Sequence, residues 1–308
     1  MLQIVILGSA AGGGFPQWNS NNEASRRARA GDPLALPRTQ SSIAATADGE
    51  RWVLINASPD LRQQINVTPQ LHPRRGPRHS PLAAVVLTSG EVDHVAGLLT
   101  LRENHPFALY ATDRVLTTLG ENSIFGALDP ELVPRRSIAI GGRFAVVDRD
   151  GHDTGIVIEA FAVPGKVPLY REDPAAGENF GTAPGDSIGL AIAAGDQACF
   201  YVPGCAALTA EVADRLRGAR LVLFDGTLWR DDEMIAAGVG RKTGRRMGHI
   251  SIAGDAGSLA GFAGLGVRRK IFVHINNTNP VLLADSAERA AVERAGWEVA
   301  HDGMELVP

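Results

Sequence analysis

The stretch LAAVVLTSGEVDHVAGLLTLRE, residues 82–103, decides the fold that we predict for this chain. Residues 83–87 form an unbroken apolar run rich in β-branched side chains, which predicts a fully buried strand. Residues 88–93 are polar and contain a glycine, so the strand ends there. Apolar side chains then recur at helical spacing from Val95 onwards, and Pro106 lies where the helix must stop. The stretch therefore predicts a buried strand, a polar turn and a helix.

Asp93 and His94 lie at this predicted strand-to-helix turn, where α/β proteins commonly bind their ligands. The pair also has a plain structural explanation, because Asp often caps a helix and a nearby His is often solvated or bonded to backbone. Ser89 and Glu91 alternate with the pair along the same loop, which gathers several polar groups near one point. The stretch alone leaves both interpretations open.

Two later strands end in the same way as the first. Residues 221–224 predict a buried strand that Asp225 follows, and residues 271–273 predict another that His274 follows. His249 precedes a further helical run. Each of these three strand ends carries a side chain that can bind a metal. This repetition favours one shared metal site.

This order of Asp-His, Asp and His resembles the metallo-β-lactamase superfamily, whose central motif is His-x-His-x-Asp-His. Residues 89–94, SGEVDH, match only its last two positions. Segments spread over the whole chain further resemble the coenzyme PQQ synthesis protein B family: LGSAAGGGFPQWN (7–19), RTQSSIA (38–44), NASPDLRQQ (56–64), VDHVAGLLTLRE (92–103), VPGKVPLY (163–170), MGHIS (247–251) and HINNTNP (274–280). The resemblance implies a four-layer αββα sandwich, which the clusters of strands with interposed helices also fit.

In that superfamily, two sets of side chains hold two metal ions. In this chain Ser89 and Glu91 stand where the first set has histidines, and Lys166 lies where its later histidine would fall. Ser is a poor ligand and Lys is cationic, so we expect the first set to hold no transition metal. The second set is retained as Asp93, His94, His274 and Asp225. We therefore expect one metal ion rather than two.

One carboxylate and two histidines with open positions suit Fe(II) and oxygen chemistry, and the same donors also accept zinc. The resemblance implies a role in pyrroloquinoline quinone (PQQ) biosynthesis. The implied reaction is oxygen-dependent hydroxylation of the tyrosine ring in a Glu–Tyr cross-linked precursor. Two alternatives stay open: a carrier of the quinone or its precursor, and a zinc-dependent hydrolase. The hydrolase is less favoured because dinuclear hydrolases use two metals.

Further polar residues receive expected roles beside the metal. In related superfamily members a His in the context of His249 moves protons, so we assign it acid–base work, against the alternative of a helix-start His bonded to backbone. Asn276 and Asn279, just past the third strand end, are placed to bond a polar substrate. Ser89 and Glu91, in the vacated first set, are expected to contact substrate as well.

A Glu–Tyr compound carries carboxylates, which Arg and Lys bind well. We expect Arg102 or Lys166 to face the pocket and bind one of them. The alternative for Arg102 is pairing with a nearby Glu on the helix surface. Residues 164–187 form the longest segment without secondary-structure signal, and loops of that length often border binding sites as lids.

Residues 19–37 are polar, basic and proline-bearing, and predict a surface excursion. Many members of the family carry Cys-x-Cys-x-x-Cys here, suited to a structural zinc. This chain has Ser20, Asn22 and Ser25 at those places, so we expect no structural zinc.

Composition sets the remaining expectations for the 308 residues, which we predict to form one domain over 1–308. A hydrophobic content of 44% and a charged content of 21% are ordinary for a globular protein. A net charge of −4 gives no reason to expect nucleic acid or an anionic membrane as partner. Two cysteines, no basic leader and no apolar run of about 20 residues predict a cytoplasmic protein without a membrane span. Other enzymes of the same pathway are possible partners, and the oligomeric state is left open.

Overall fold

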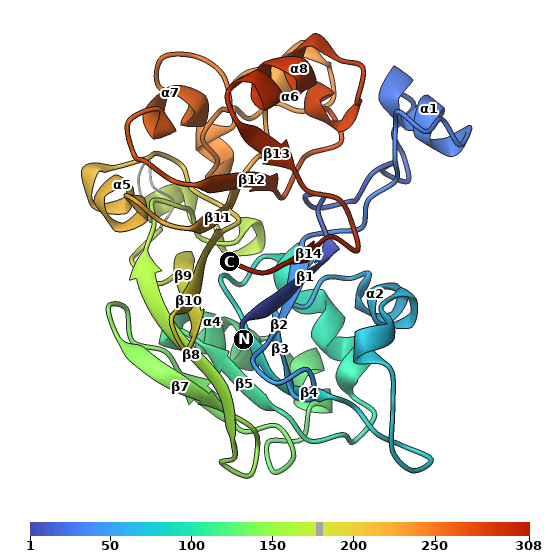
Figure 1. The fold of residues 1–308 in the computed structure, drawn as a ribbon, viewed down its shortest axis with the longest axis vertical. Coiled ribbons are helices and arrows are strands. Elements are labelled where there is room, and N and C mark those ends of the chain that lie inside the picture. Colours follow the sequence, from blue (N-terminus) through green and yellow to red (C-terminus); the bar gives the residue numbers. More distant parts are fainter. Residues whose placement is uncertain (177–180) are drawn as a thin grey trace.

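The computed structural model describes residues 1–176 and 181–308, so residues 177–180 of the predicted loop 164–187 lie outside the described part. Two seven-stranded mixed sheets stack face to face, and helices cover their outer faces (Figure 1). This arrangement confirms the predicted four-layer αββα sandwich.

The first sheet has the strand order β14-β1-β2-β3-β4-β5-β6. Its strands are β1 (Gln3–Gly8), β2 (Ser42–Thr46), β3 (Trp52–Ile55), β4 (Leu82–Val86), β5 (Ala108–Ala111), β6 (Arg135–Ser137) and β14 (Glu305–Leu306). Neighbours from β3 to β6 run parallel, and the pairs from β14 to β3 run antiparallel. The buried strand predicted at residues 83–87 is β4, in the parallel half of this sheet.

The second sheet repeats this plan with the order β13-β12-β11-β10-β9-β8-β7. Its strands are β7 (Arg143–Val147), β8 (Asp153–Ala162), β9 (Ile188–Ala194), β10 (Gln197–Val202), β11 (Leu221–Asp225), β12 (Arg269–Val273) and β13 (Trp297–Val299). Neighbours from β10 to β13 run parallel. The carboxyl ends of β11 and β12 therefore lie side by side at one edge of the sheet.

The helices are short. The α-helices are α1 (Glu23–Arg29), α2 (Leu61–Val67), α3 (Val92–Val95), α4 (Asp113–Glu121), α5 (Ala210–Leu216), α6 (Glu233–Ala236), α7 (Ser258–Phe262) and α8 (Ala287–Arg294). The 3₁₀ helices are η1 (Pro69–Leu71), η2 (Ala96–Leu101), η3 (Ser123–Ala127), η4 (Leu169–Arg171), η5 (Pro174–Ala176), η6 (Arg245–Met247) and η7 (Pro280–Leu282). None of the helices within residues 1–176 and 181–308 is long and apolar enough to cross a bilayer.

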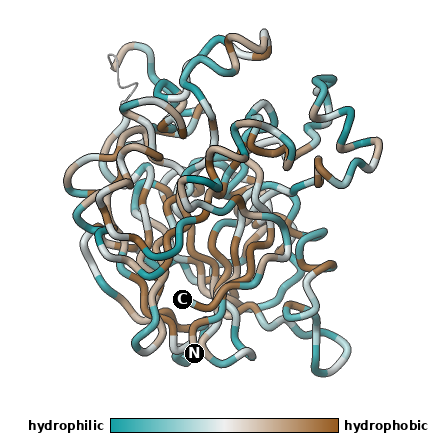
Figure 2. Tube along the Cα trace, turned by 45° about the horizontal axis from the view of Figure 1, so that its top comes forward, coloured by the Kyte–Doolittle hydropathy of each residue, from teal (hydrophilic) through white to brown (hydrophobic). Residues whose placement is uncertain are grey.

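Alternation along the strands builds three apolar layers. In β1, Ile4 and Ile6 enter the core between the two sheets, whereas Val5 and Leu7 pack under the helices outside. In β11, Leu223 faces the core and Phe224 faces the helices over the second sheet. Figure 2 shows the result, with hydrophobic segments gathered in the strands and hydrophilic ones in the outer loops.

Two local predictions need correction. The excursion at residues 19–37 contains helix α1, which projects from the body of the molecule (Figure 1). The helix predicted after Asp93 is a single turn, α3, that continues as the 3₁₀ helix η2. Gly97 explains the tight packing there, because a Cβ at this position would lie 2.0 Å from the carbonyl oxygen of Ser58.

Candidate metal centre

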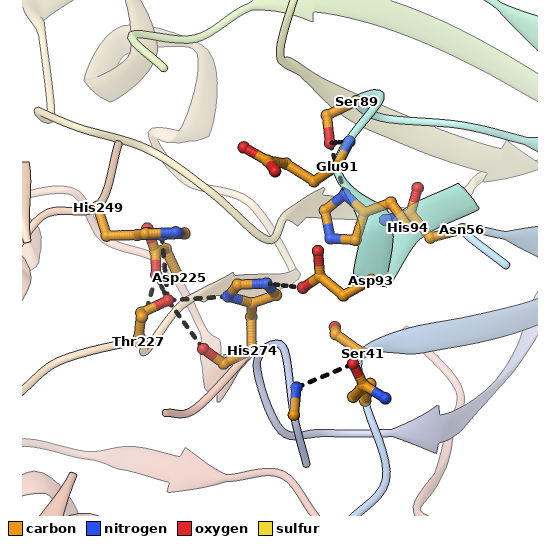
Figure 3. A network of polar contacts seen from close by, with 12 residues as sticks. Ser41, Asn56, Ser89, Glu91, Asp93, His94, Asp225, Thr227, His249 and His274 are labelled. Carbon is orange, nitrogen blue, oxygen red and sulfur yellow. Dashed lines mark hydrogen bonds and ion pairs between the residues drawn. The ribbon is translucent and has the colours of Figure 1, made fainter. Parts of the chain in front are cut away.

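The two sheets bring the predicted metal residues together. Asp93 and His94 lie in α3, just after β4 of the first sheet. Asp225 ends β11 and His274 follows β12, both in the second sheet. Figure 3 shows these side chains, with His249, converging on one point between the sheets. The strand ends that the sequence singled out are therefore neighbours in the folded chain.

Asp93, His94 and His274 form the inner group of this site. Their potential ligand atoms lie within 4.8 Å of one another. Oδ2 of Asp93 lies 3.0 Å from Nε2 of His274, and the rings of His94 and His274 meet edge to face at 5.5 Å. His274 has a φ of 56°, a left-handed conformation that costs a non-glycine residue about 1–3 kcal/mol. Such strain is typical of residues whose placement serves a site.

His94 is oriented by hydroxyl groups on its far side. Oγ of Ser89 lies 2.7 Å from Nδ1 of His94, and Oγ1 of Thr88 lies 3.5 Å from the same atom. Asn56 braces Thr88 through two hydrogen bonds of 2.9 Å. The other ring nitrogen, Nε2, is buried and has no hydrogen-bond partner among the described residues. A buried orphan nitrogen carries a desolvation cost unless a ligand satisfies it.

The charges of the inner group are strongly coupled. Burial alone would raise the pKa of Asp93, but the charge of His94 and the hydrogen bond from His274 lower it well below its usual range. Burial lowers the pKa of His94 to about 4, against the charge of Asp93. Burial would also lower the pKa of His274, yet its contact with Asp93 raises it. The carboxylate is thus ionised and His94 is neutral at pH 7.

These residues fit a metal ion. One carboxylate and two histidines supply the donor set that first-row metals accept. His94, whose Nε2 is the buried orphan, shares one group of potential ligand atoms with Asp93 and His274.

Asp225 belongs to a second group, with His249 and His274, whose potential ligand atoms also lie within 4.8 Å of one another. It is fully buried, and its Oδ2 lies 2.8 Å from Nδ1 of His249. The rings of His249 and His274 stack at 5.1 Å. Asp225 thus shares His274 with the inner group, and His249 lies where the sequence predicted a residue beside the metal.

A cavity of about 470 Å³ opens onto the inner group. The predicted residues that line it are Ser89, Glu91, Asp93, His94, Lys166, His249, His274 and Asn276. Leu169, Met234 and Met247 add an apolar wall, and Lys242 adds a cation. The segment at 164–187 borders the cavity through Lys166, Leu169 and Ser187, as predicted.

Ion pairs close one side of the cavity. Nζ of Lys166 pairs with Glu91. Both residues stand at positions where the superfamily has ligands of its first metal set. The carboxylate of Glu172 accepts hydrogen bonds from Nζ of Lys242 at 3.1 Å and from Nη2 of Arg246 at 2.6 Å. Nζ of Lys166 also lies 4.0 Å from Glu172. Among these five groups, three cations face two carboxylates.

Two predicted substrate residues lie elsewhere. Arg102 does not line the cavity: its side chain is 57% exposed, lies 3.8 Å from Glu103 and donates to the carbonyl of Leu99. The tight 3₁₀ turn of η2 carries it to the surface, so the alternative of a surface ion pair is correct. Asn279 is fully buried, and its amide donates to the carbonyls of Gly226 and Thr227. It supports the backbone near the site and does not face the cavity.

Several other residues gain a place. Asn276 lines the cavity, and its Nδ2 donates to Oγ1 of Thr278 at 2.7 Å. Asn22 caps α1 by accepting from the backbone N–H of Ser25, and the hydroxyl of Ser25 lies 3.1 Å from that of Ser20.

Sequence reasoning missed Thr227, Lys242 and the two methionines. Thr227 is the one with a usable signal, since it comes two residues after a strand-end carboxylate. Met234 lies in α6, Met247 in η6 and Lys242 between them, in a segment of short helices and turns beyond β11 whose path no periodicity reveals.

Comparison with known proteins shows the family to which this chain belongs. A model of the Beta-lactamase superfamily domain matches residues 51–275. Coenzyme PQQ synthesis protein B of Gluconacetobacter diazotrophicus is 58% identical to the chain, and that of a Methylorubrum extorquens strain is 53% identical; each match covers 99% of both chains. The crystal structure of Zn(2+)-bound PqqB from Methylobacterium extorquens superposes with a TM-score of 0.94 at 52% identity, over 99% of this chain and 100% of that one. The chain therefore belongs to the coenzyme PQQ synthesis protein B family, within the β-lactamase superfamily.

Proposed function

We propose that this protein acts in PQQ biosynthesis, as an Fe(II)- and oxygen-dependent hydroxylase of the tyrosine ring in a Glu–Tyr precursor, in which one oxygen atom enters a ring C–H bond and the other leaves as water with two electrons from an external reductant. Full-length relatives at 53–58% identity carry the name coenzyme PQQ synthesis protein B, which supports the pathway. The observation that carries the reaction type is the inner group of one carboxylate and two histidines. The superfamily's other metal set is replaced by Ser89, which bonds His94, and Glu91, which pairs with Lys166.

Asp93, His94 and His274 would hold the metal. Fe(II) at this set, when bound, supplies oxygen activation, whereas zinc supplies only Lewis acidity. The residues do the rest of the work: Ser89 and the hydroxyls behind it hold His94, and Asp93 faces Nε2 of His274. Fixed ligands of this kind raise metal affinity because little conformational freedom is lost on binding.

The cavity suits an aromatic amino-acid conjugate. Its volume of about 470 Å³ falls within the range of about 300–1,000 Å³ that is typical of small-molecule sites. Met234, Met247 and Leu169 offer soft apolar contacts to a tyrosine ring. Lys166 and Lys242 offer charge to the carboxylates of the Glu part, and Asn276 offers an amide group.

His249 is placed to move a proton. It lines the cavity, its Nδ1 contacts Asp225 and Thr227, and its Nε2 makes no hydrogen bond to any described residue. A ring held on one nitrogen and open on the other can accept a proton from a substrate hydroxyl or ring carbon. We propose this as its role in the hydroxylation.

A carrier of PQQ or its precursor is the second candidate, and a zinc hydrolase is the third. Anaerobic loading with Fe(II), followed by oxygen and the Glu–Tyr compound, separates the three. Oxygen uptake that depends on both Fe(II) and the compound supports the hydroxylase. Tight binding without turnover supports the carrier, and metal-dependent bond cleavage without oxygen supports the hydrolase. A cytoplasmic location and contact with other pathway enzymes complete this proposal.

A further inference from the structure

The hydroxyl of Thr227 lies at the centre of the second group of site residues (Figure 3). Its Oγ1 lies 2.7 Å from Oδ1 of Asp225, 2.9 Å from Nδ1 of His274 and 3.1 Å from Nδ1 of His249. The carbonyl oxygen of His274 is also 2.9 Å away. Four polar atoms thus surround a single hydroxyl that is almost fully buried.

The chemistry of these atoms decides where the protons are. A hydroxyl has one proton to donate and two lone pairs that accept. The carboxylate of Asp225 and the carbonyl of His274 can only accept, and the charged carboxylate, which makes the shorter contact of 2.7 Å, takes the Thr227 proton. Nδ1 of His274 then donates to Oγ1 at 2.9 Å, and the proton on Nδ1 of His249 is shared between Oγ1 at 3.1 Å and Oδ2 of Asp225 at 2.8 Å, so both Nδ1 atoms carry a proton.

The hydrogen bonds of Asp225 independently require a proton on Nδ1 of His249. Its Oδ1 accepts from the backbone N–H and the hydroxyl of Thr227, at 3.0 and 2.7 Å. Its Oδ2 accepts from the backbone N–H of Cys205 at 2.9 Å and from Nδ1 of His249 at 2.8 Å. These four bonds fill the approximately four acceptor sites of a carboxylate. Asp225 is therefore engaged as an acceptor and has no lone pair left for a metal ion.

We infer that Thr227 is a positioning residue that keeps a proton on Nδ1 of both rings. Nε2 of His274 then faces Asp93, where a bound metal would take its lone pair in place of the hydrogen bond to the carboxylate, and Nε2 of His249 faces the cavity. Asp225 serves as their anchor instead of as a ligand, which changes the role predicted for it from the sequence. This inference rests on the proposed metal set Asp93, His94 and His274, and it adds the residue that orients the third member.

The wild-type protein with added Zn²⁺ tests the tautomers directly. Long-range ¹H–¹⁵N NMR correlations of the imidazoles distinguish a protonated Nδ1 from a protonated Nε2. We expect Nδ1–H on both His249 and His274. A protonated Nε2 with a bare Nδ1 on either ring overturns the inference. The measurement uses neither oxygen nor the Glu–Tyr compound, so it is independent of the hydroxylase proposal.

Variants test the consequence for metal binding. Thr227→Val keeps the shape and removes the hydroxyl, and we expect zinc affinity to fall about 10- to 100-fold, as for other groups that orient metal-binding histidines. Thr227→Ser restores the hydroxyl and should recover most of the affinity. Thr154→Val is the matched control, because Thr154 is equally buried but donates to the carbonyl of Val146 in β7, away from the cavity. Wild-type zinc affinity in a folded Thr227→Val protein, or no recovery with Ser, contradicts the positioning role.

Discussion

Oγ of Ser89 lies 2.7 Å from Nδ1 of His94. Ser89 stands where the superfamily's central motif has its first metal-binding histidine, and here its hydroxyl bonds a retained histidine instead. The contact occupies Nδ1 and leaves Nε2 as the nitrogen that a metal would bind. Nε2 has no hydrogen-bond partner among the described residues. A residue predicted to touch substrate thus also shapes the metal set.

Removing this hydroxyl should weaken metal binding without unfolding the protein. We expect Ser89→Ala to lower zinc affinity about 10-fold, because His94 loses its nearest orienting partner. Competition with a chromophoric chelator measures the affinity. Ser187→Ala is the control, since Ser187 lines the same cavity and its hydroxyl contacts the carbonyl of Lys166. Equal affinities for both variants would refute the supporting role of Ser89.

The charge of Lys166 should matter to the substrate rather than to the metal. Lys166→Met keeps the bulk of the side chain and removes the cation that lines the cavity. We expect about 10- to 100-fold weaker binding of the Glu–Tyr compound, since a charge-assisted hydrogen bond contributes about 1.5–3 kcal/mol. Metal content should be unchanged. Arg102→Met, which removes an exposed cation outside the cavity, should leave both quantities unaltered. Unchanged substrate affinity in Lys166→Met would exclude this contact.

The sequence could predict those site residues whose positions follow from the backbone topology. Asp93, His94, Asp225 and His274 were found because each lies at or just after the carboxyl end of a buried strand, and such ends share an edge. Lys166 was found through the family motif that it interrupts. Arg102 was misplaced because a helical period extrapolated across eight residues fails when the helix tightens into the 3₁₀ form.

Hydrogen-bond roles were beyond the reach of the sequence. The spacing of Asn279 from His274 could not tell a cavity-lining amide from one that faces the backbone of Gly226 and Thr227. Because β11 and β12 are parallel neighbours, Thr227 and His274 lie side by side just after their strands. This placement lets Thr227 contact both His274 and His249. A single sequence carries no signal for such a three-way contact.

The ion pairs of Glu172 with Lys242 and Arg246 should break at low pH. The hydrogen bond from Arg246, joined by that from Lys242, lowers the pKa of Glu172 against the opposing effect of burial. Because the folded pKa lies below the ordinary value, the stabilisation is complete above the ordinary pKa and is lost as pH falls through the folded one. Hydrogen exchange of residues 166–176, corrected for intrinsic rates, should therefore accelerate in this acid range.

Glu172→Gln should raise that exchange already at pH 7 and remove its acid dependence. Glu103→Gln serves as the control, since Glu103 lies beside the exposed Arg102. Identical exchange in the Gln variant and the wild type at pH 7 would show that the ion pairs with Lys242 and Arg246 do not hold this segment.

Asn279 should act on stability. Asn279→Ala leaves the buried carbonyls of Gly226 and Thr227 without its amide donor and should lower the free energy of unfolding by about 1–3 kcal/mol. Urea titration at constant m-value measures the change. Asn122→Ala, which removes a similar amide bond to the carbonyl of Thr118 near the surface, should cost less than about 1 kcal/mol. Equal costs would argue against a special structural role for Asn279.

The central claim is that Asp93, His94 and His274 hold one Fe(II) that serves ring hydroxylation. The most direct test loads the protein anaerobically with Fe(II), adds the Glu–Tyr compound and ascorbate as the two-electron reductant, then adds ¹⁸O₂ and examines the product by mass spectrometry. The account predicts a product that gains ¹⁸O on the tyrosine ring, with the gain abolished in His274→Ala and retained in Arg102→Met. A product without added oxygen, or one whose new oxygen comes from water rather than from ¹⁸O₂, would contradict it.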